Sequence, residues 1–195
     1  MISIMDDHIR KELRQLVQAE VEENDVSVVP YNRDWPQQFT RESHHLRVIL
    51  DDISTAIEHF GSTSVPDLWS KPIVDILVGT TNGSYLNPSH VHQLADLDYI
   101  FLGEDGRRPG RWFFRKRGEQ SFNLSIVPFD SDLWRDNLLL RDYLRQHPDE
   151  KKKYGEVKLE GLSASGGSLI RYQNTKRAFV GEMVRRAREW GERDG

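Results

Sequence analysis

The hydrophobic residues of this chain recur at two spacings, which divide it into a mixed central part and largely helical ends. Residues 6–24 carry apolar side chains three or four positions apart, and this spacing predicts an amphipathic helix. Residues 26–31 are rich in β-branched side chains and predict a strand. Asp34 is expected to cap a second helix that begins at Trp35 and Pro36, and residues 53–60 predict another strand.

The clearest strand signal lies between Ile73 and Val78. This run is almost continuously apolar, as is typical of a strand buried on both faces, and Asp75 interrupts it. A helix over residues 87–95 and strands over residues 99–102, 111–117 and 122–129 are predicted next. From Asp132 onward the pattern predicts three helices, which are separated near His147 and near residues 163–167. These elements indicate an α/β protein with an N-terminal helix and C-terminal helices.

The length of 195 residues suits one domain with a helical appendage. We expect a helical extension over residues 1–25 and a single domain over residues 26–190, because no linker or internal repeat divides the remainder. The hydrophobic share of 37% and the charged share of 30% are those of an ordinary globular protein. The net charge of -4 argues against generic nucleic-acid binding, which requires a strongly basic face.

The chain has no cysteine, which excludes disulfides, thiolate metal sites and thiol nucleophiles. The N-terminus lacks the features of a signal peptide, and no apolar run approaches the length of a membrane span. We therefore expect a cytoplasmic protein with no membrane partner.

The strongest candidate site runs from Glu58 to Val78. Gly61 would let the backbone approach a ligand closely, and the hydroxyls of Ser62, Thr63 and Ser64 could hold phosphate oxygens. Lys71 adds positive charge, and the Asp75 carboxylate could hold a magnesium ion against phosphate. The alternative is a capped turn followed by a buried carboxylate that backbone N–H groups or an arginine satisfy. An unpaired buried charge costs several kcal/mol, so Asp75 needs a partner of one kind or the other.

The segment HFGSTSVPDLWSKPIVDILV resembles the signature of the GrpB family, an uncharacterised family placed in the nucleotidyltransferase superfamily. That signature reads H-x-G-S-T-x-V-P-G-L-x-x-K-P-x-I-D-I. The resemblance continues in VVPYNRDW, FFRKRG and LRDYLRQHPDEKKKY, and in Tyr172 and Lys176, so it covers most of the chain from Val28 to Met183.

The resemblance implies a nucleotidyltransferase-like mixed β-sheet flanked by helices, with Gly61 and Ser62 on the phosphate side and Asp75 beside them. It also implies a transferase that uses magnesium, in which Asp75 and Lys71 are catalytic and Asp75 is the metal ligand.

Two positions depart from the pattern of the superfamily. Nucleotidyltransferases usually carry two acidic residues on this strand, and Ile73 stands where the first would be. The family commonly has His-x-His on a neighbouring strand, where this chain has Asn123 and Ser125. Both should point from one face of the sheet, where they could hydrogen-bond a substrate, but they are poor metal ligands.

One dense basic patch is interleaved with aromatic residues between positions 107 and 117. In a strand, Arg111 and Arg115 share one face with Phe113, and we expect one or both to reach a triphosphate or another anion. The alternative is a set of solvated edge-strand charges, which applies most to Arg107, Arg108 and Arg117.

Three functions remain open from the sequence. The first is metal-assisted nucleotidyl transfer to a small acceptor. The second is a module that binds a nucleotide or other phosphorylated small molecule without catalysis, which Ile73, Asn123 and Ser125 favour. The third is a structural or interaction protein whose terminal helices form a homo-oligomer.

Overall fold

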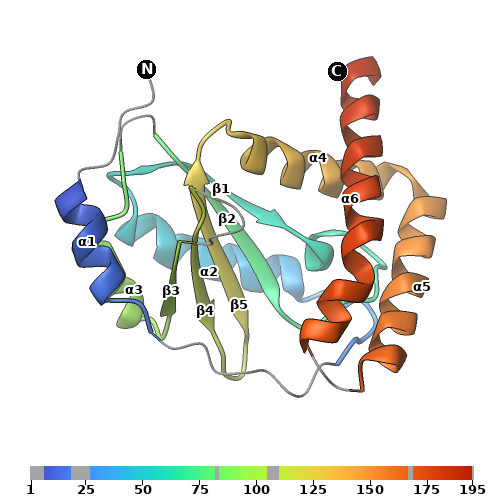
Figure 1. Ribbon diagram of the computed structural model, residues 1–195, viewed down its shortest axis with the longest axis horizontal. Helices are drawn as coiled ribbons and strands as arrows, with labels where there is room; N and C mark the ends of the chain where they lie inside the picture. Colours follow the sequence, from blue (N-terminus) through green and yellow to red (C-terminus); the bar gives the residue numbers. More distant parts are fainter. Residues whose placement is uncertain (1–6, 19–26, 82–83, 105–109, 167–168, 195) are drawn as a thin grey trace.

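The computed structural model describes residues 7–18, 27–81, 84–104, 110–166 and 169–194, with only the backbone for residues 169–173, 175, 176 and 194. The helices and strands of these ranges form one sheet with helices on both faces (Figure 1). In chain order they are α1 (Asp7–Gln15), α2 (Trp35–Ile49), β1 (Ser54–Phe60), the 3₁₀ turn η1 (Ser62–Ser64), β2 (Val74–Thr80), α3 (Pro88–Ala95), β3 (Ile100–Glu104), β4 (Trp112–Lys116), β5 (Phe122–Pro128), α4 (Asp132–Gln146), α5 (Pro148–Ser165) and α6 (Leu169–Asp194).

The five strands lie in the order β1-β2-β5-β4-β3. β2 and β5 are parallel, whereas the other three pairs are antiparallel. The expected mixed sheet flanked by helices, with helices at both ends of the chain, is therefore confirmed. Because β2 has a neighbour on each side and helices cover both faces, most of its residues are buried, as its apolar run predicts.

The main core lies on the face of the sheet that α2 covers, which is the rear face in Figure 1. Helices α1 and α3 pack against the same core. Leu13 of α1 is fully buried there, so the helical extension contributes directly to this core. The apolar side chains that alternate along each strand face it, including Ile76 on β2 and Phe114 on β4.

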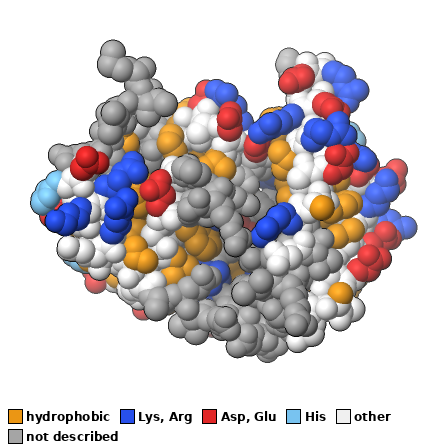
Figure 2. All heavy atoms as spheres, in the orientation of Figure 1, with side chains coloured by type: hydrophobic (Ala, Val, Ile, Leu, Met, Phe, Trp, Pro, Cys, Tyr) orange, Lys and Arg blue, Asp and Glu red, His pale blue; other side chains and the backbone are white. Residues whose placement is uncertain are grey.

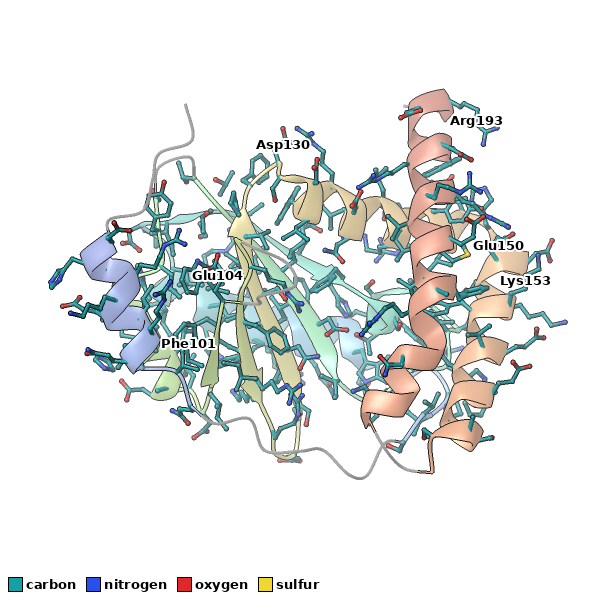
Figure 3. The ribbon with its side chains drawn as sticks, viewed as in Figure 1. Phe101, Glu104, Asp130, Glu150, Lys153 and Arg193 are labelled. Atoms are coloured by element: carbon teal, nitrogen blue, oxygen red, sulfur yellow. The ribbon has the colours of Figure 1, made fainter. Side chains whose placement is uncertain are left out.

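The C-terminal helices lie toward the opposite face. Trp134 of α4 packs on Phe60, Leu77 and Val127 and covers one part of that face. A separate apolar cluster joins α4, α5 and α6 to Val65 and Leu68, which follow η1. Figure 3 shows Glu150 on the side of α5 that faces α6, where Arg186 binds it at 2.8 Å, and Lys153 on the outer side. Among the described helices, none combines the length and apolar character that a membrane crossing requires.

Three local predictions from the sequence are corrected. Asp34 does not cap α2, because its own backbone is already helical and its side chain makes no cap hydrogen bond. In the described part of the strand expected over residues 26–31, which is 27–31, there is a single bridge between Val29 and Ser70. The N-terminal helix ends at Gln15, and residues 19–24 of that prediction lie outside the described residues.

Candidate functional site

A group of polar side chains lies on the front face of the sheet, beside the part that α4 covers. The strand register aligns Asp75 of β2 with Asn123 of β5, and Asn123 with Arg115 of β4. The next row on the same face contains Leu77, Ser125 and Phe113. Figure 2 shows this face of the molecule hollowed between the sheet and α6.

Gly61 lies directly against the Asp75 carboxylate. A Cβ atom at position 61 would be only 2.4 Å from Oδ2 of Asp75, so a larger residue cannot fit without displacing that group. Gly61 also has a φ of 69° and a ψ of -167°, a combination that is essentially restricted to glycine. The sequence therefore needs glycine here for both space and conformation, and this brings the loop and the strand together.

A chain of hydrogen bonds links the Asp75 carboxylate to a guanidinium group. Arg117 donates from Nη2 to Oδ1 of Asn123 at 2.9 Å, and Asn123 donates from Nδ2 to Oδ1 of Asp75 at 2.8 Å. Because a guanidinium group can only donate, the amide oxygen of Asn123 must face Arg117 and its N–H groups must face Asp75. Arg117 is held by the carbonyl oxygens of Lys116 and Phe122. It is therefore an organised part of the site, although the sequence favoured an edge-strand charge.

Two further arginines lie beside Phe113 on this face. The Arg111 guanidinium carbon is 4.5 Å from the centre of the Phe113 ring, and that of Arg115 is 5.6 Å from it. Arg111 also donates from Nε to the buried hydroxyl of Ser125 at 3.0 Å. Trp112 and Phe114 point to the core on the other side of β4, so the expected alternation along this strand is present.

The three hydroxyl groups of η1 have different environments. Ser62 is partly exposed, and its side chain is hydrogen-bonded to Tyr154 of α5. Burial, together with the nearby charge of Asp75, raises the pKa of Tyr154 to about 12 against the opposing effect of that hydrogen bond. Thr63 and Ser64 are buried, and they bond His59 and the Gly61 carbonyl oxygen at 3.0 and 2.6 Å. Of the three, Ser62 is therefore the hydroxyl best placed to meet a ligand.

Cationic side chains of α4 and α5 bind the backbone of the segment that contains η1. Each donates to a carbonyl oxygen: Arg141 to His59 at 3.1 Å, Arg145 to Ser64 at 2.8 Å, Lys151 to Pro66 at 3.1 Å, and Lys158 to Trp69 at 2.9 Å. We call these four side chains the carbonyl clamp. The clamp fixes the position of the loop relative to the helices, and therefore relative to Asp75.

His59 supports the loop from the core side of the sheet. Its ring stacks on Phe39 of α2 with centroids 5.0 Å apart, and Nε2 lies 3.0 Å from Oγ1 of Thr63. Burial, with smaller contributions from the positive charges of Arg145 and Arg141, lowers the pKa of His59 to about 4. The imidazole is therefore neutral at physiological pH and acts as a packing and positioning group.

The described residues do not fit a resident divalent cation. Oδ1 of Asp75 already accepts an N–H from Asn123. Glu58 is another carboxylate described on this face. It is bound by Arg141 at 2.7 Å, so it does not supply the second acidic ligand that is missing at Ile73. No group of three His, Asp or Glu side chains suited to a metal ion occurs within the described ranges. This donor set differs from the paired carboxylates that the resemblance implies.

The structure brings together Gly61, Ser62, Asp75, Asn123, Arg115 and Arg117, which we call the candidate site. Ser125 lies one row away on the same face, and Arg111, two rows away along the chain, reaches Ser125 with its side chain. Lys71 is partly exposed and lies between the bridge at Ser70 and the start of β2. The positions of Arg107 and Arg108, and the side chains of Tyr172 and Lys176, lie outside the described residues.

Sequence reasoning missed Tyr154 and the anchoring role of Arg145. Both lie more than 80 residues along the chain from the loop residues that they contact, and these contacts depend on how the helices pack. The sequence feature that could have pointed to them is the segment LRDYLRQHPDEKKKY, which occurs together with the loop motif in the family pattern. It indicates that both segments belong to the pattern but does not identify the contacts.

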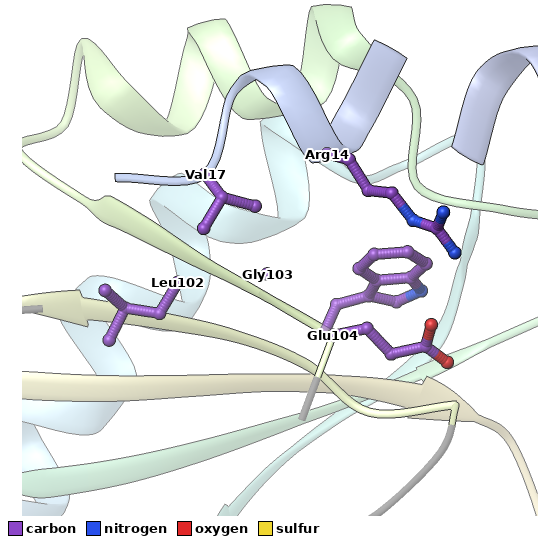
Figure 4. Close-up of a pocket in the computed structure, with 6 residues that line it drawn as sticks. Arg14, Val17, Leu102, Gly103 and Glu104 are labelled. Atoms are coloured by element: carbon purple, nitrogen blue, oxygen red, sulfur yellow. The ribbon is translucent and has the colours of Figure 1, made fainter. Parts of the chain in front are cut away.

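Two cavities lie apart from the candidate site. One of about 290 Å³ lies between the end of α1 and strand β3, where Arg14, Val17, Leu102 and Glu104 line it (Figure 4). The other, of about 270 Å³, lies beside α5 and is lined by residues that include Trp69, Lys151, Gly155 and Leu159. Neither lining includes a residue of the candidate site.

Comparison with known proteins places the chain in one family. The family profile described as GrpB protein matches residues 25–186. A crystal structure of conserved protein GrpB from Enterococcus faecalis is 31% identical, with a TM-score of 0.73 over 84% of this chain and 99% of that one. The UPF0157 protein BH1888 of Halalkalibacterium halodurans is 28% identical over 182 residues, which is 91% of each chain. The UPF0157 protein YqkA of Bacillus subtilis is 27% identical over 85% of this chain, which spans 48% of that relative. The profile match and the architecture shared with the Enterococcus protein show that this chain belongs to the GrpB family.

Proposed function

We propose that this protein binds a phosphorylated small molecule at the candidate site, and that arginine side chains rather than a resident metal supply the positive charge. The observation that carries the proposal is the charge balance on this sheet face. Arg117 is linked through Asn123 to the Asp75 carboxylate, Arg115 lies in the same row, and Arg111 lies further along the face. The other carboxylate described on this face, Glu58, is bound by Arg141. The whole chain has a net charge of -4, so this concentration of arginines among the described side chains favours a small anionic ligand.

The loop supplies the shape that such a ligand needs. Gly61 has no side chain to obstruct its approach, and the Ser62 hydroxyl can donate to a phosphate oxygen. The carbonyl clamp holds this segment in place before a ligand arrives, which reduces the entropy lost on binding. Lys71 remains a proposed additional charge from the segment before β2.

A nucleotide is the ligand class that the nucleotidyltransferase resemblance favours, and magnesium-assisted nucleotidyl transfer is the second candidate function. The observation in its favour is the position of Asp75 against Gly61. Because the described residues do not form a metal site of their own, magnesium would have to arrive with the nucleotide, whose phosphates are its usual partners. In-line transfer depends mainly on positioning and charge neutralisation. The Asp75 carboxylate and the arginines could serve these two needs.

Thermal unfolding with candidate ligands tests the proposal. Sodium tripolyphosphate, ATP, GTP, CTP and UTP are added to the protein in EDTA and, separately, in magnesium. A ligand at 100 times its Kd stabilises the native state by about 2.7 kcal/mol, so a bound anion should raise the melting temperature in EDTA.

Two arginine variants test whether the shift in melting temperature arises from binding at the candidate site. Arg117→Gln should weaken the shift, because it removes a charge from the sheet face. Arg193→Gln, at the exposed end of α6 (Figure 3), should leave the shift unchanged. A shift that appears only with magnesium and a nucleotide would favour the second candidate. If tripolyphosphate and all four nucleotides leave the melting temperature unchanged under both conditions, both functions are wrong.

A further inference from the structure

Phe113 is an aromatic residue on the polar side of the sheet. Its neighbours along β4, Trp112 and Phe114, belong to the main core, whereas Phe113 belongs to none of the hydrophobic clusters formed by the described residues. It is partly exposed on the face that carries Asp75 and Asn123. A partly exposed ring of this kind can stack against a planar group.

The Arg111 guanidinium group lies over this ring, and a hydrogen bond to Ser125 holds Arg111 in position. The Arg111 guanidinium carbon lies 4.5 Å from the centre of the Phe113 ring. Its Nε donates to the hydroxyl of Ser125, which is 1% exposed and therefore held rigidly within the sheet. Guanidinium planes and aromatic rings are the surfaces on which nucleobases stack in proteins.

The distance to the candidate site suits one ligand that reaches both places. Phe113 lies two strands across and two residues along from Asp75, which gives roughly 12 Å between their Cα atoms from standard strand spacings. An inorganic phosphate at Asp75 and Gly61 would not reach Phe113. A phosphate chain that carries a sugar and a base has the length to do so.

We propose that Arg111 and Phe113 form a stacking platform for the planar aromatic group of the ligand, so that the ligand is a nucleotide whose phosphates lie toward Gly61 and Asp75. This inference rests on the proposed anion binding and changes the role of Arg111, which the sequence assigned to phosphate. The platform holds the base, and Arg117 and Arg115 supply the charge for the phosphates.

Calorimetric titration of the full chain in EDTA, at constant ionic strength, tests the platform with two kinds of probe. The nucleoside triphosphates ATP, GTP, CTP and UTP carry a base, whereas sodium tripolyphosphate does not. Wild-type protein should bind at least one nucleotide about tenfold more tightly than tripolyphosphate, which is the range expected from stacking one base on an aromatic ring. Phe113→Leu should remove this advantage and leave the affinity for tripolyphosphate within twofold of wild type.

Two further variants keep the result interpretable. Phe129→Leu alters another exposed aromatic residue, one whose ring packs on Trp134, and should change neither affinity. Arg111→Lys retains the charge but loses the planar group, so it should reduce nucleotide binding while tripolyphosphate binding persists. This variant provides the test if Phe113→Leu does not fold.

Each outcome separates the two proposals. If tripolyphosphate binds as tightly as every nucleotide, or if Phe113→Leu and Arg111→Lys bind nucleotides as wild type does, the platform is wrong and anion binding stands. If wild-type protein binds neither tripolyphosphate nor any of the nucleotides, the proposed anion binding is wrong, and the proposed platform is wrong as well.

Discussion

Acidification should destabilise this protein through His59. The imidazole is 7% exposed, and its pKa in the folded protein is about 4, below the ordinary value of 6.5. The unfolded chain therefore binds a proton near pH 6.5 that the folded protein does not accept until about pH 4. The stability contributed by neutral His59 is complete above the unfolded pKa and declines as the pH falls through this window. The linkage relation gives a loss of about 2 kcal/mol between pH 7 and pH 5, and about 3 kcal/mol by pH 4.

The assay is urea unfolding at pH 7, 6, 5 and 4 for wild-type protein and His59→Gln. Glutamine does not titrate, and its amide can still reach the hydroxyl of Thr63. Wild type should therefore lose about 2 kcal/mol more than the variant between pH 7 and pH 5. Carboxylates titrate in the same range, but their contribution is common to both proteins and cancels in the difference.

His44→Gln is the matched control, because His44 is an exposed residue of α2. It should retain the pH dependence of wild type. Parallel curves for wild type and His59→Gln would refute the reasoning, because they would mean that His59 accepts its proton equally well in the folded and unfolded chains.

Three substitutions test the geometry of the loop and strand by urea unfolding. Gly61→Ala should lower the free energy of unfolding by about 3 kcal/mol, because of its backbone conformation and the clash with Asp75. Gly118→Ala, whose added methyl group meets open space, should change that free energy by less than about 1 kcal/mol. Similar values for the two variants would contradict the close approach of Gly61 to Asp75. Asp75→Asn should lower the free energy of unfolding by about 1 kcal/mol, because the charge-assisted hydrogen bond with Asn123 becomes a neutral one. A decrease of about 3 kcal/mol or more would instead indicate that Asp75 belongs to a buried ion pair. Asp67 has a φ of 64° where the family signature has glycine, so Asp67→Gly should stabilise the protein by roughly 0.5 to 1 kcal/mol, and a loss would show that the side chain is needed there.

The order of helices and strands was predictable because it depends on local periodicity. The β2 run, the helix starting at Trp35 and the break at His147 all appear where the pattern indicates them. The cap predicted at Asp34 is absent, and the sequence could not show this because a capping residue type does not reveal its backbone angles. The strand pairing was also beyond the pattern, since β2 pairs in parallel with β5 across 48 residues.

The candidate site was predictable only in part, for a related reason. Gly61 and Asp75 come together because a short loop joins them, and the sequence contains that proximity directly. The bonds from Arg117 to Asn123 and from Tyr154 to Ser62 depend on the return of a hairpin and on the packing of α5. Arg117 was therefore indistinguishable from an ordinary surface charge until the fold placed it beside an amide.

The carbonyl clamp has a consequence for how this protein opens. Residues 59–69 form little regular secondary structure, and such a loop would ordinarily exchange its amide hydrogens quickly through small local fluctuations. Here its carbonyl groups are bonded to side chains of α4 and α5, and Val65 and Leu68 are buried with the same helices. Releasing the loop therefore requires those helices to separate from it, so loop and helices form one cooperative unit, and the amides of this loop should exchange together with those of α4 and α5.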